Sequence, residues 1–198
     1  MALVRVTLGG KRLGYVRINK AGSTTIINYL GQLLCNEKPT HHGGTNVQDY
    51  CGKDSYIGRE KGFEAYHKEL KECEIRIAVY RDPIDKVIAG FYYCQEFKPH
   101  LNNLDRFLDN YQHFLKDNYI RIHCRTNTDM LGPDPGIYTH VWNMREIDTH
   151  LLPFLEQLGG KKIQKTRLRE HAPRTISDEQ KAKAKEVMAI DYENGWYK

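Results

Sequence analysis

GYVRINKAGSTTIINYL, residues 14 to 30, joins a run of alternating apolar and polar residues to a run with helical spacing. Upstream, residues 3 to 18 alternate on both sides of Gly9-Gly10, which predicts two short strands joined as a hairpin. Downstream, apolar residues between residues 26 and 34 follow the i, i+3, i+4, i+7, i+8 spacing of an amphipathic helix. The residues between the two runs therefore form a tight turn from a strand into a helix N-terminus.

The composition favours a single globular domain that spans residues 1–198. A chain of 198 residues with 40% hydrophobic content can bury one substantial core. Thirty Lys plus Arg against 25 Asp plus Glu give a net charge of +5, which suits an anionic ligand or a solvated surface. The five cysteines form no CxxC pair, which indicates free thiols in a reducing compartment.

The N-terminus and the hydropathy pattern predict a cytoplasmic protein without a membrane partner. Arg5, Lys11 and Arg12 interrupt the first apolar residues, unlike the apolar core of a signal peptide. No window approaches the roughly 18 apolar residues that a membrane-spanning helix needs.

A second strand–turn–helix unit is predicted at EIRIAVYRDPIDKVIAGFYYCQEF, residues 74 to 97. Residues 75 to 80 form an apolar run rich in β-branched side chains, Asp82 suits the N-cap position, and Pro83 suits the first helical position. Two such units predict an α/β fold with a parallel sheet.

The remaining segments alternate between predicted elements and loops. Residues 36 to 62 are rich in Gly, His, Asn and Asp and predict a long loop. Further elements are predicted as a helix over 101–116, a strand over 136–142, a helix over 146–158 that Gly159-Gly160 ends, and a last helix that Ser177 and Gln180 open as a capping box.

The first turn has the groups that a phosphate site requires. Gly22 permits a tight turn, and the helix that follows contributes the positive end of its dipole. Lys20 adds a charge, and residues 23–25 add three hydroxyls. The order differs from the GxxxxGK[ST] nucleotide loop, because here the lysine precedes the glycine. The alternative is a helix cap beside a solvated lysine.

The second turn adds Arg81 at the end of the predicted strand over residues 75–80. An arginine is always charged, and its fork of donors suits a second phosphate. Two anion sites at two strand ends imply a ligand with two phosphate groups.

Both turns resemble motifs of one enzyme family. KAGSTT, residues 20 to 25, is similar to the 5'-phosphosulfate loop of PAPS-dependent sulfotransferases, and YRDPIDKVIAGFYY, residues 80 to 93, looks like their 3'-phosphate motif. Residues 125–159 and the IDYENGWY segment at 190–197 resemble the carbohydrate-type group more loosely.

The resemblance implies a P-loop-like three-layer fold, in which a central parallel sheet is flanked by helices. It also implies transfer of a sulfuryl group from PAPS to a hydroxyl acceptor, such as that of a carbohydrate, with adenosine 3',5'-bisphosphate as product and no metal. Lys20 would act in catalysis. The implied cofactor-binding residues are Lys20, Ala21, Gly22, Ser23, Thr24, Thr25 and Arg81.

The chain departs from the family pattern at three positions. Asn19 stands where the family usually has proline, and Lys86 replaces a common arginine. Ala89 occupies the place of a serine that helps to hold the 3'-phosphate. The loss of one neutral hydrogen bond costs about 0.5 to 1.5 kcal/mol, so PAPS binding is expected to weaken but to survive.

A base is needed to accept the proton of the acceptor hydroxyl, and histidine suits this role near neutral pH. His67 is the choice that the resemblance favours, with His41, His42 and Glu69 as alternatives. For each candidate, the alternative is a surface residue without a catalytic role.

Other predicted roles follow from position along the chain. His123 is expected at a helix or strand end without a chemical role, and Arg174 could approach the cofactor or form a charged turn. Acceptor recognition is expected from loops over 36–62 and 95–135 and from residues 169–174.

Two other functions compete with sulfuryl transfer, and a third is not supported by the sequence. A nucleotide kinase would use the first turn as an unusual phosphate loop, but no acidic magnesium ligand is obvious at a strand end. A nucleotide-binding protein with a degenerate sulfotransferase fold would explain Ala89. The sequence shows no clustered basic face, so a nucleic-acid partner is not expected.

Overall fold

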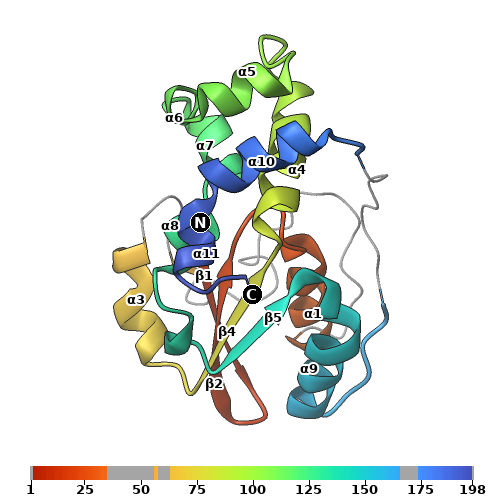
Figure 1. The fold of residues 1–198 in the computed structure, drawn as a ribbon. Coiled ribbons are helices and arrows are strands. Elements are labelled where there is room, and N and C mark those ends of the chain that lie inside the picture. The colour runs from red at the N-terminus through yellow and green to blue at the C-terminus, as the bar shows by residue number, and fades with distance from the viewer. Residues whose placement is uncertain (1, 35–55, 58–62, 166–173, 198) are drawn as a thin grey trace.

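The computed structural model describes residues 2–34, 56–57, 63–165 and 174–197. A five-stranded sheet in the order β3-β1-β2-β4-β5 forms its centre (Figure 1). The strands are β1 (Ala2–Leu8), β2 (Lys11–Arg17), β3 (Tyr56–Ile57), β4 (Ile75–Tyr80) and β5 (His140–Asn143).

The sheet is mixed, so the prediction of an α/β class is confirmed, and the predicted parallel sheet makes up only part of it. β2, β4 and β5 are parallel to one another, but β1 is antiparallel to β2 and to β3. The cause is the predicted hairpin, since a two-residue connection can join only antiparallel strands. Gly9 and Gly10 have φ angles of +55° and +75°, as the hairpin turn requires.

Helices cover both faces of the sheet (Figure 1). On one face, α1 (Ser23–Leu34) and α9 (Leu152–Gly159) pack against a core that includes Tyr15 and Ile77. On the other, α3 (Phe63–Lys71) and α8 (Asn127–Leu131) pack around Ala78. The chain thus forms three layers, and the amphipathic helix predicted after the first turn is confirmed as α1.

A third group of helices lies beyond the carboxyl ends of the parallel strands, at the top of Figure 1. α4 continues from β4, and its predicted start is confirmed, because Asp82 accepts a hydrogen bond from the Asp85 amide at 2.9 Å and Pro83 follows. The group comprises α4 (Pro83–Gln95), α5 (Leu104–Asp109), α6 (Tyr111–Phe114), α7 (Asn118–Cys124) and α10 (Asp178–Val187). These helices share one hydrophobic core around Phe91 and Phe107.

The single helix predicted over residues 101–116 is wrong, because it is broken into α5 and α6 at Asn110. The Asn110 side chain donates to the Arg106 carbonyl at 3.0 Å, which competes with continuation of the helix. The loop expected over 95–135 is likewise wrong, since much of this range forms α5 to α8.

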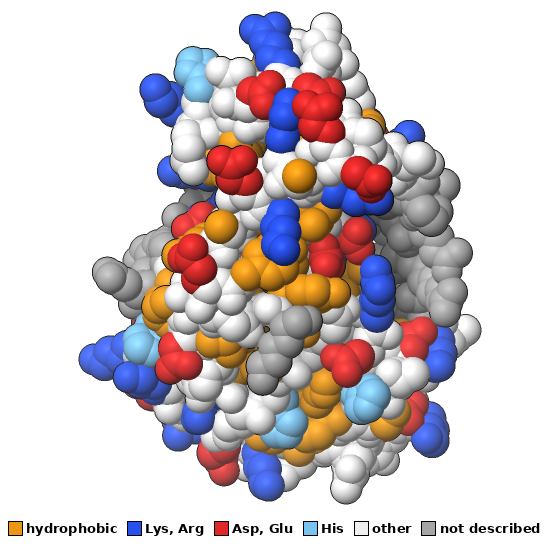
Figure 2. All heavy atoms as spheres, in the orientation of Figure 1, with side chains coloured by type: hydrophobic (Ala, Val, Ile, Leu, Met, Phe, Trp, Pro, Cys, Tyr) orange, Lys and Arg blue, Asp and Glu red, His pale blue; other side chains and the backbone are white. Residues whose placement is uncertain are grey.

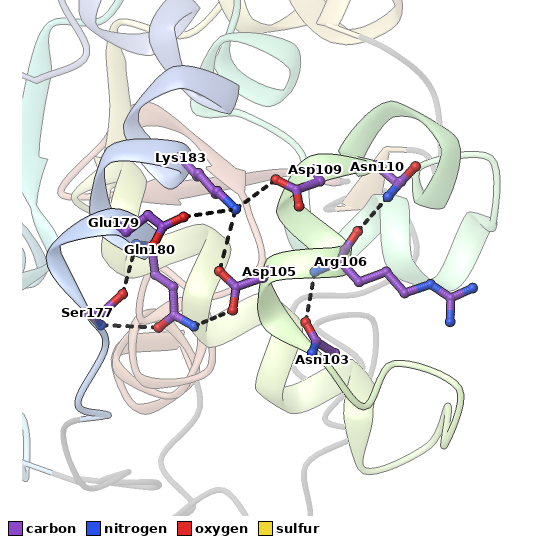
Figure 3. A network of polar contacts seen from close by, with 9 residues as sticks. All are labelled: Asn103, Asp105, Arg106, Asp109, Asn110, Ser177, Glu179, Gln180 and Lys183. Carbon is purple, nitrogen blue, oxygen red and sulfur yellow. Dashed lines mark hydrogen bonds and ion pairs between the residues drawn. The ribbon is translucent and has the colours of Figure 1, made fainter.

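Polar contacts join α10 to α5 (Figure 3). Lys183 forms ion pairs with Asp109 at 3.0 Å, with Asp105 at 3.6 Å and with Glu179 at 3.5 Å. The predicted capping box is confirmed, because Ser177 and Gln180 exchange two hydrogen bonds, both of 3.1 Å. These contacts fix the first turn of α10 against α5.

The other predicted elements are displaced. β5 begins at His140 rather than at residue 136, because Pro135–Ile137 forms a short 3-10 helix first. The helix expected over 146–158 consists of a π-helical turn, Ile147–Leu151, followed by α9, and Gly160 with a φ of +67° ends it.

The surface that Figure 2 presents has hydrophobic side chains gathered near the middle of the molecule, with acidic and basic side chains around them. None of the helices in the described part of the chain is long and apolar enough to cross a membrane. Most of the loop predicted over 36–62 lies outside the described residues.

Candidate anion-binding site

The turn between β2 and α1 has two residues with positive φ angles, Lys20 at +65° and Gly22 at +73°. A Cβ atom at Gly22 would lie 2.4 Å from Cδ1 of Ile147, so any other residue here would have to adopt a positive φ and displace the Ile147 side chain. A lysine with a positive φ is uncommon and costs of order 1 kcal/mol or more. Packing against the sheet therefore holds this turn in an unusual shape.

The start of α1 leaves backbone donors directed toward the turn. The Gly22 carbonyl accepts the first helical hydrogen bond, from the Ile26 amide at 3.2 Å, which places Gly22 at the N-cap position. Glycine has no side chain to cap the helix, and the amides of residues 23–25 have no helical acceptor. This geometry, with the dipole of a twelve-residue helix, suits an anion.

The turn after β4 lies beside the first turn, because β2 and β4 are parallel neighbours. Nη1 of Arg81 donates to the Lys20 carbonyl at 3.3 Å, and the Arg81 Nε is buried without a hydrogen-bond partner. Burial lowers the pKa of Arg81, while Asp85 and Asp82 act in the opposite direction. The structure therefore brings together Lys20 and Arg81, which are 61 residues apart in the sequence.

The start of α4 is closed to anions, in contrast to that of α1. The Asp82 carboxylate caps it, and Pro83 has no N–H group. Arg145 adds a second guanidinium near this turn, where its Nη2 lies 3.1 Å from the Asp85 carboxylate. An anion near this turn would contact arginine side chains and not helix amides.

The ammonium of Lys20 lies over an aromatic ring. Its Nζ is 3.2 Å from the ring centroid of Tyr93 on α4. The His123 ring on α7 lies next to this ring, with 4.6 Å between the centroids, and Tyr119 lies 5.0 Å from His123. We call Tyr93, Tyr119 and His123 the aromatic cluster.

Contacts from two elements fix His123 in this position. Nδ2 of Asn19, in the first turn, donates to the carbonyl of Ile122 at 2.8 Å. On α4, a Cβ atom at Gly90 would lie 2.5 Å from the His123 carbonyl oxygen, so glycine permits the close approach of α4 and α7. The backbone at His123 is thus held between the first turn and α4.

The environment of His123 keeps its ring neutral near pH 7. Burial, followed by the charges of Lys20 and Lys86, lowers the pKa of His123 to about 4. Its Nδ1 is buried without a hydrogen-bond partner. Sequence reasoning gave His123 no chemical role, because no local pattern indicates that α7 packs against a turn more than 100 residues earlier.

His67 lies elsewhere, on α3, where its ring packs against Phe63 with 4.7 Å between the centroids. Its neighbours Tyr66 and Leu70 belong to the core on the sheet face that α3 covers. Nε2 of His67 and Oε2 of Glu69 are buried without hydrogen-bond partners. His67 thus packs within the α3 layer, whereas His123 packs against the ring that contacts Lys20. The alternatives at positions 41 and 42 fall outside the described residues.

The remaining predicted residues lie around these two turns. Ala21 is fully buried, Ser23 is buried, and Thr24 is exposed. Arg174 lies over the ring of Tyr92 on α4, with 4.7 Å from its Cζ to the ring centroid. Lys86 is fully buried and donates to the Arg125 carbonyl.

The arrangement can hold two negative groups side by side, one at the start of α1 and one at Arg81, with a neutral histidine nearby. Comparisons of the chain with protein-family models, with curated proteins and with solved structures gave no match.

Proposed function

We propose that this chain is a sulfotransferase that moves a sulfuryl group from PAPS to a hydroxyl acceptor, such as that of a carbohydrate. The observation that supports this most directly is the hydrogen bond of 3.3 Å between Arg81 and the Lys20 carbonyl, which sets the turn that carries Lys20 beside the turn that carries Arg81. A nucleotide with phosphates at its 5' and 3' positions matches two such turns. A P-loop-like fold and a cytoplasmic location belong to the same proposal.

The two turns would divide the ligand between them. The 5'-phosphosulfate would contact Lys20 and the amides and hydroxyls of residues 21–25, and Arg81 would contact the 3'-phosphate. In the transfer, a bond forms from the acceptor oxygen to sulfur while the bond from sulfur to the 5'-phosphate oxygen breaks. Lys20 would stabilise the negative charge that develops on the leaving phosphate.

The proton of the acceptor hydroxyl needs a base, and two histidines compete for this role. His67 is the residue that the family resemblance favours. His123 lies against the ring that also contacts the Lys20 ammonium, and its lowered pKa keeps the ring neutral, with one ring nitrogen able to accept a proton. An anion bound at Lys20 would offset the lysine charge and raise the pKa of His123 toward neutral pH, where a general base is most effective. We therefore favour His123.

The decisive experiment is a calorimetric titration of the protein with adenosine 3',5'-bisphosphate, compared with ADP and with ATP, each with and without magnesium. We expect a metal-independent preference for the bisphosphate. Arg81→Ala should weaken binding of the bisphosphate by about 10-fold to 100-fold, since a hydrogen bond to a charged group contributes about 1.5 to 3 kcal/mol, and should hardly change binding of ADP. Equal losses for both ligands would contradict the two-phosphate arrangement.

A transfer assay with labelled PAPS then separates catalysis from binding. Lys20→Ala should reduce transfer by about 100-fold or more. His123→Ala and His67→Ala should differ, with the larger loss of kcat at His123 if it accepts the proton.

A nucleotide-binding protein without transfer activity is the second candidate, and Ala89 favours it because the family serine is absent. It predicts binding of the bisphosphate without transfer to any acceptor in the screen. Preference for ATP with magnesium in the titration would instead support a nucleotide kinase.

A further inference from the structure

Behind the second turn, three segments far apart in the sequence meet at buried polar side chains. α8 and α11 (Ala189–Glu193) contact each other, and both lie close to the end of β4 (Figure 1). Asn127, the first residue of α8, and Asp191, in α11, have no exposed surface. Buried polar groups of this kind need partners, so their contacts identify what they hold in place.

Both carboxylate oxygens of Asp191 accept hydrogen bonds from backbone amides at the start of α8. Oδ2 accepts from the Asn127 amide at 2.8 Å, and Oδ1 accepts from the Thr128 amide at 2.7 Å. The Thr126 hydroxyl accepts from the third amide, that of Asp129, at 3.0 Å. The amides that a helix leaves without helical acceptors are thus occupied here by groups of the chain itself.

A buried cation accompanies the buried carboxylate. Lys86 on α4 is fully buried, and its Nζ donates to the carbonyl of Arg125, directly before the Thr126 cap. Burial lowers the pKa of Lys86 to about 8, and the charge of Asp191 is the largest influence in the opposite direction. The lysine and the aspartate therefore fix α8 between α4 and α11.

The side chain of Asn127 connects this unit to the candidate site. Its Nδ2 donates to the backbone carbonyl of Arg81 at 3.0 Å, while its Oδ1 is buried without a hydrogen-bond partner. The opposite orientation of the amide would set two oxygens against each other, so the donor has to face Arg81. The Oδ1 acceptor of Asn127 is thus left unsatisfied. The Nδ2 donor of the same side chain makes a hydrogen bond to Arg81, the residue that follows β4.

We propose that Asn127 and Asp191 are positioning residues for Arg81. Asp191 fixes the backbone of Asn127, and the Asn127 side chain fixes the carbonyl of Arg81, so the C-terminal helix α11 sets the position from which the Arg81 guanidinium meets its ligand. The identity of that ligand, the 3'-phosphate of an adenosine 3',5'-bisphosphate, rests on the proposed function, whereas the positioning itself does not.

Hydrogen exchange of the ligand-free protein tests the positioning directly. Asn127→Leu keeps a similar volume and removes the donor, and Asn127→Ala is the second variant. We expect exchange at the amides of residues 81 and 82 to rise about 10-fold in both variants. Thr128→Ala is the matched control, because its hydroxyl donates to the Ile190 carbonyl at 3.3 Å and does not contact Arg81. Unchanged exchange at residues 81 and 82 in the Asn127 variants, or an equal rise in the control, would overturn the proposal.

Binding provides a second readout that a general loss of stability would not produce. Adenosine 3',5'-bisphosphate and adenosine 5'-phosphate are titrated into each variant at a temperature where all are folded. Asn127→Leu should reduce affinity for the bisphosphate about 10-fold and affinity for the monophosphate less than twofold. If the wild-type protein does not prefer the bisphosphate, the proposed function fails and the exchange result alone decides the positioning. If it does, and the Asn127 variants lose affinity for both ligands equally, the positioning role is wrong.

Discussion

The two strand–turn–helix units, β2 to α1 and β4 to α4, share a topology, but their helices begin in opposite ways. At the first, Gly22 occupies the N-cap position without a side chain, and the amides of residues 23–25 have no helical acceptor. At the second, the Asp82 carboxylate caps the helix, and Pro83 has no N–H group. The first turn offers backbone donors to an anion, whereas the second offers arginine side chains.

The difference shows that position in a parallel sheet does not by itself create an anion site. Strand ends of β2 and β4 lie side by side, yet the residues at the two N-caps decide what each end offers. Under the proposed function, the leaving phosphate would contact the backbone-rich turn, where charge develops, and the 3'-phosphate would contact the arginine. The following predictions test this division.

The largest effect is expected at Gly22. Gly22→Ala should lower the free energy of unfolding by about 3 kcal/mol, because a positive φ costs about 1 to 2 kcal/mol and the overlap with Ile147 adds a similar amount. Gly160→Ala is the matched control, since Gly160 has a φ of +67° and a Cβ atom there would meet nothing within 4 Å. It should lose only about 1 kcal/mol in urea denaturation, the cost of the positive φ alone. Equal losses would show that the Ile147 contact does not constrain the first turn.

The second helix start should depend on its side-chain cap. Asp82→Ala should lower the free energy of unfolding by about 1 kcal/mol, whereas Asp82→Asn should cost much less, because asparagine also caps helices well. Urea denaturation of both variants provides the comparison. If Asp82→Asn lost as much free energy of unfolding as Asp82→Ala, the negative charge of Asp82, and not its capping hydrogen bond, would be what stabilises the helix.

His123 lies between the two units and should make the protein sensitive to acid. Its pKa is about 4 in the folded protein and about 6.5 when unfolded, so the unfolded state takes up the proton first as the pH falls. Stability is therefore complete above pH 6.5 and decreases toward pH 4. From pH 7 to pH 5.5 the loss should be about 0.6 kcal/mol once solvent screening is included.

Urea denaturation at the two pH values checks this expectation. His123→Gln should lose less stability over this interval than the wild-type protein, while His113→Gln, at an exposed position on α6, should behave like the wild type. An identical pH dependence in His123→Gln and wild type would assign the acid sensitivity to other groups.

The smallest effect is expected for the charge beside Arg81. Asp82→Asn keeps the cap but removes a carboxylate that acts on the Arg81 guanidinium. Affinity for adenosine 3',5'-bisphosphate should rise about twofold, consistent with the modest energy of partly exposed charge pairs. Calorimetry at low ionic strength measures this, and no change or a loss of affinity would place the anion away from Asp82.

Features that depend on neighbouring residues were predictable from the sequence. The hairpin at Gly9-Gly10, the strand Ile75–Tyr80 and the cap at Asp82 follow from local patterns, and all three are confirmed. The break at Asn110 was missed although asparagine is a recognised competitor of helix hydrogen bonds, so a signal was present there.

Contacts between distant segments were not predictable in the same way. Asn19 meets Ile122 across 103 residues, and Asn127 meets Asp191 across 64. Neither pair belongs to a periodic pattern, because each depends on how α7 and α8 pack after the chain has folded. The position of His123 in the aromatic cluster follows from such packing, and sequence reasoning therefore gave it no role.

The indole of Trp196 donates to the Gly132 carbonyl at 2.7 Å and is almost fully buried, so a residue near the C-terminal end of the described chain completes the core beside α8. During synthesis, residues up to Asn127 emerge before Asp191 and Trp196 exist. At roughly 5 to 20 residues per second, the 64 residues from Asn127 to Asp191 require about 3 to 13 seconds. Over that interval the nascent chain contains the residues of both turns but lacks the groups that hold α8.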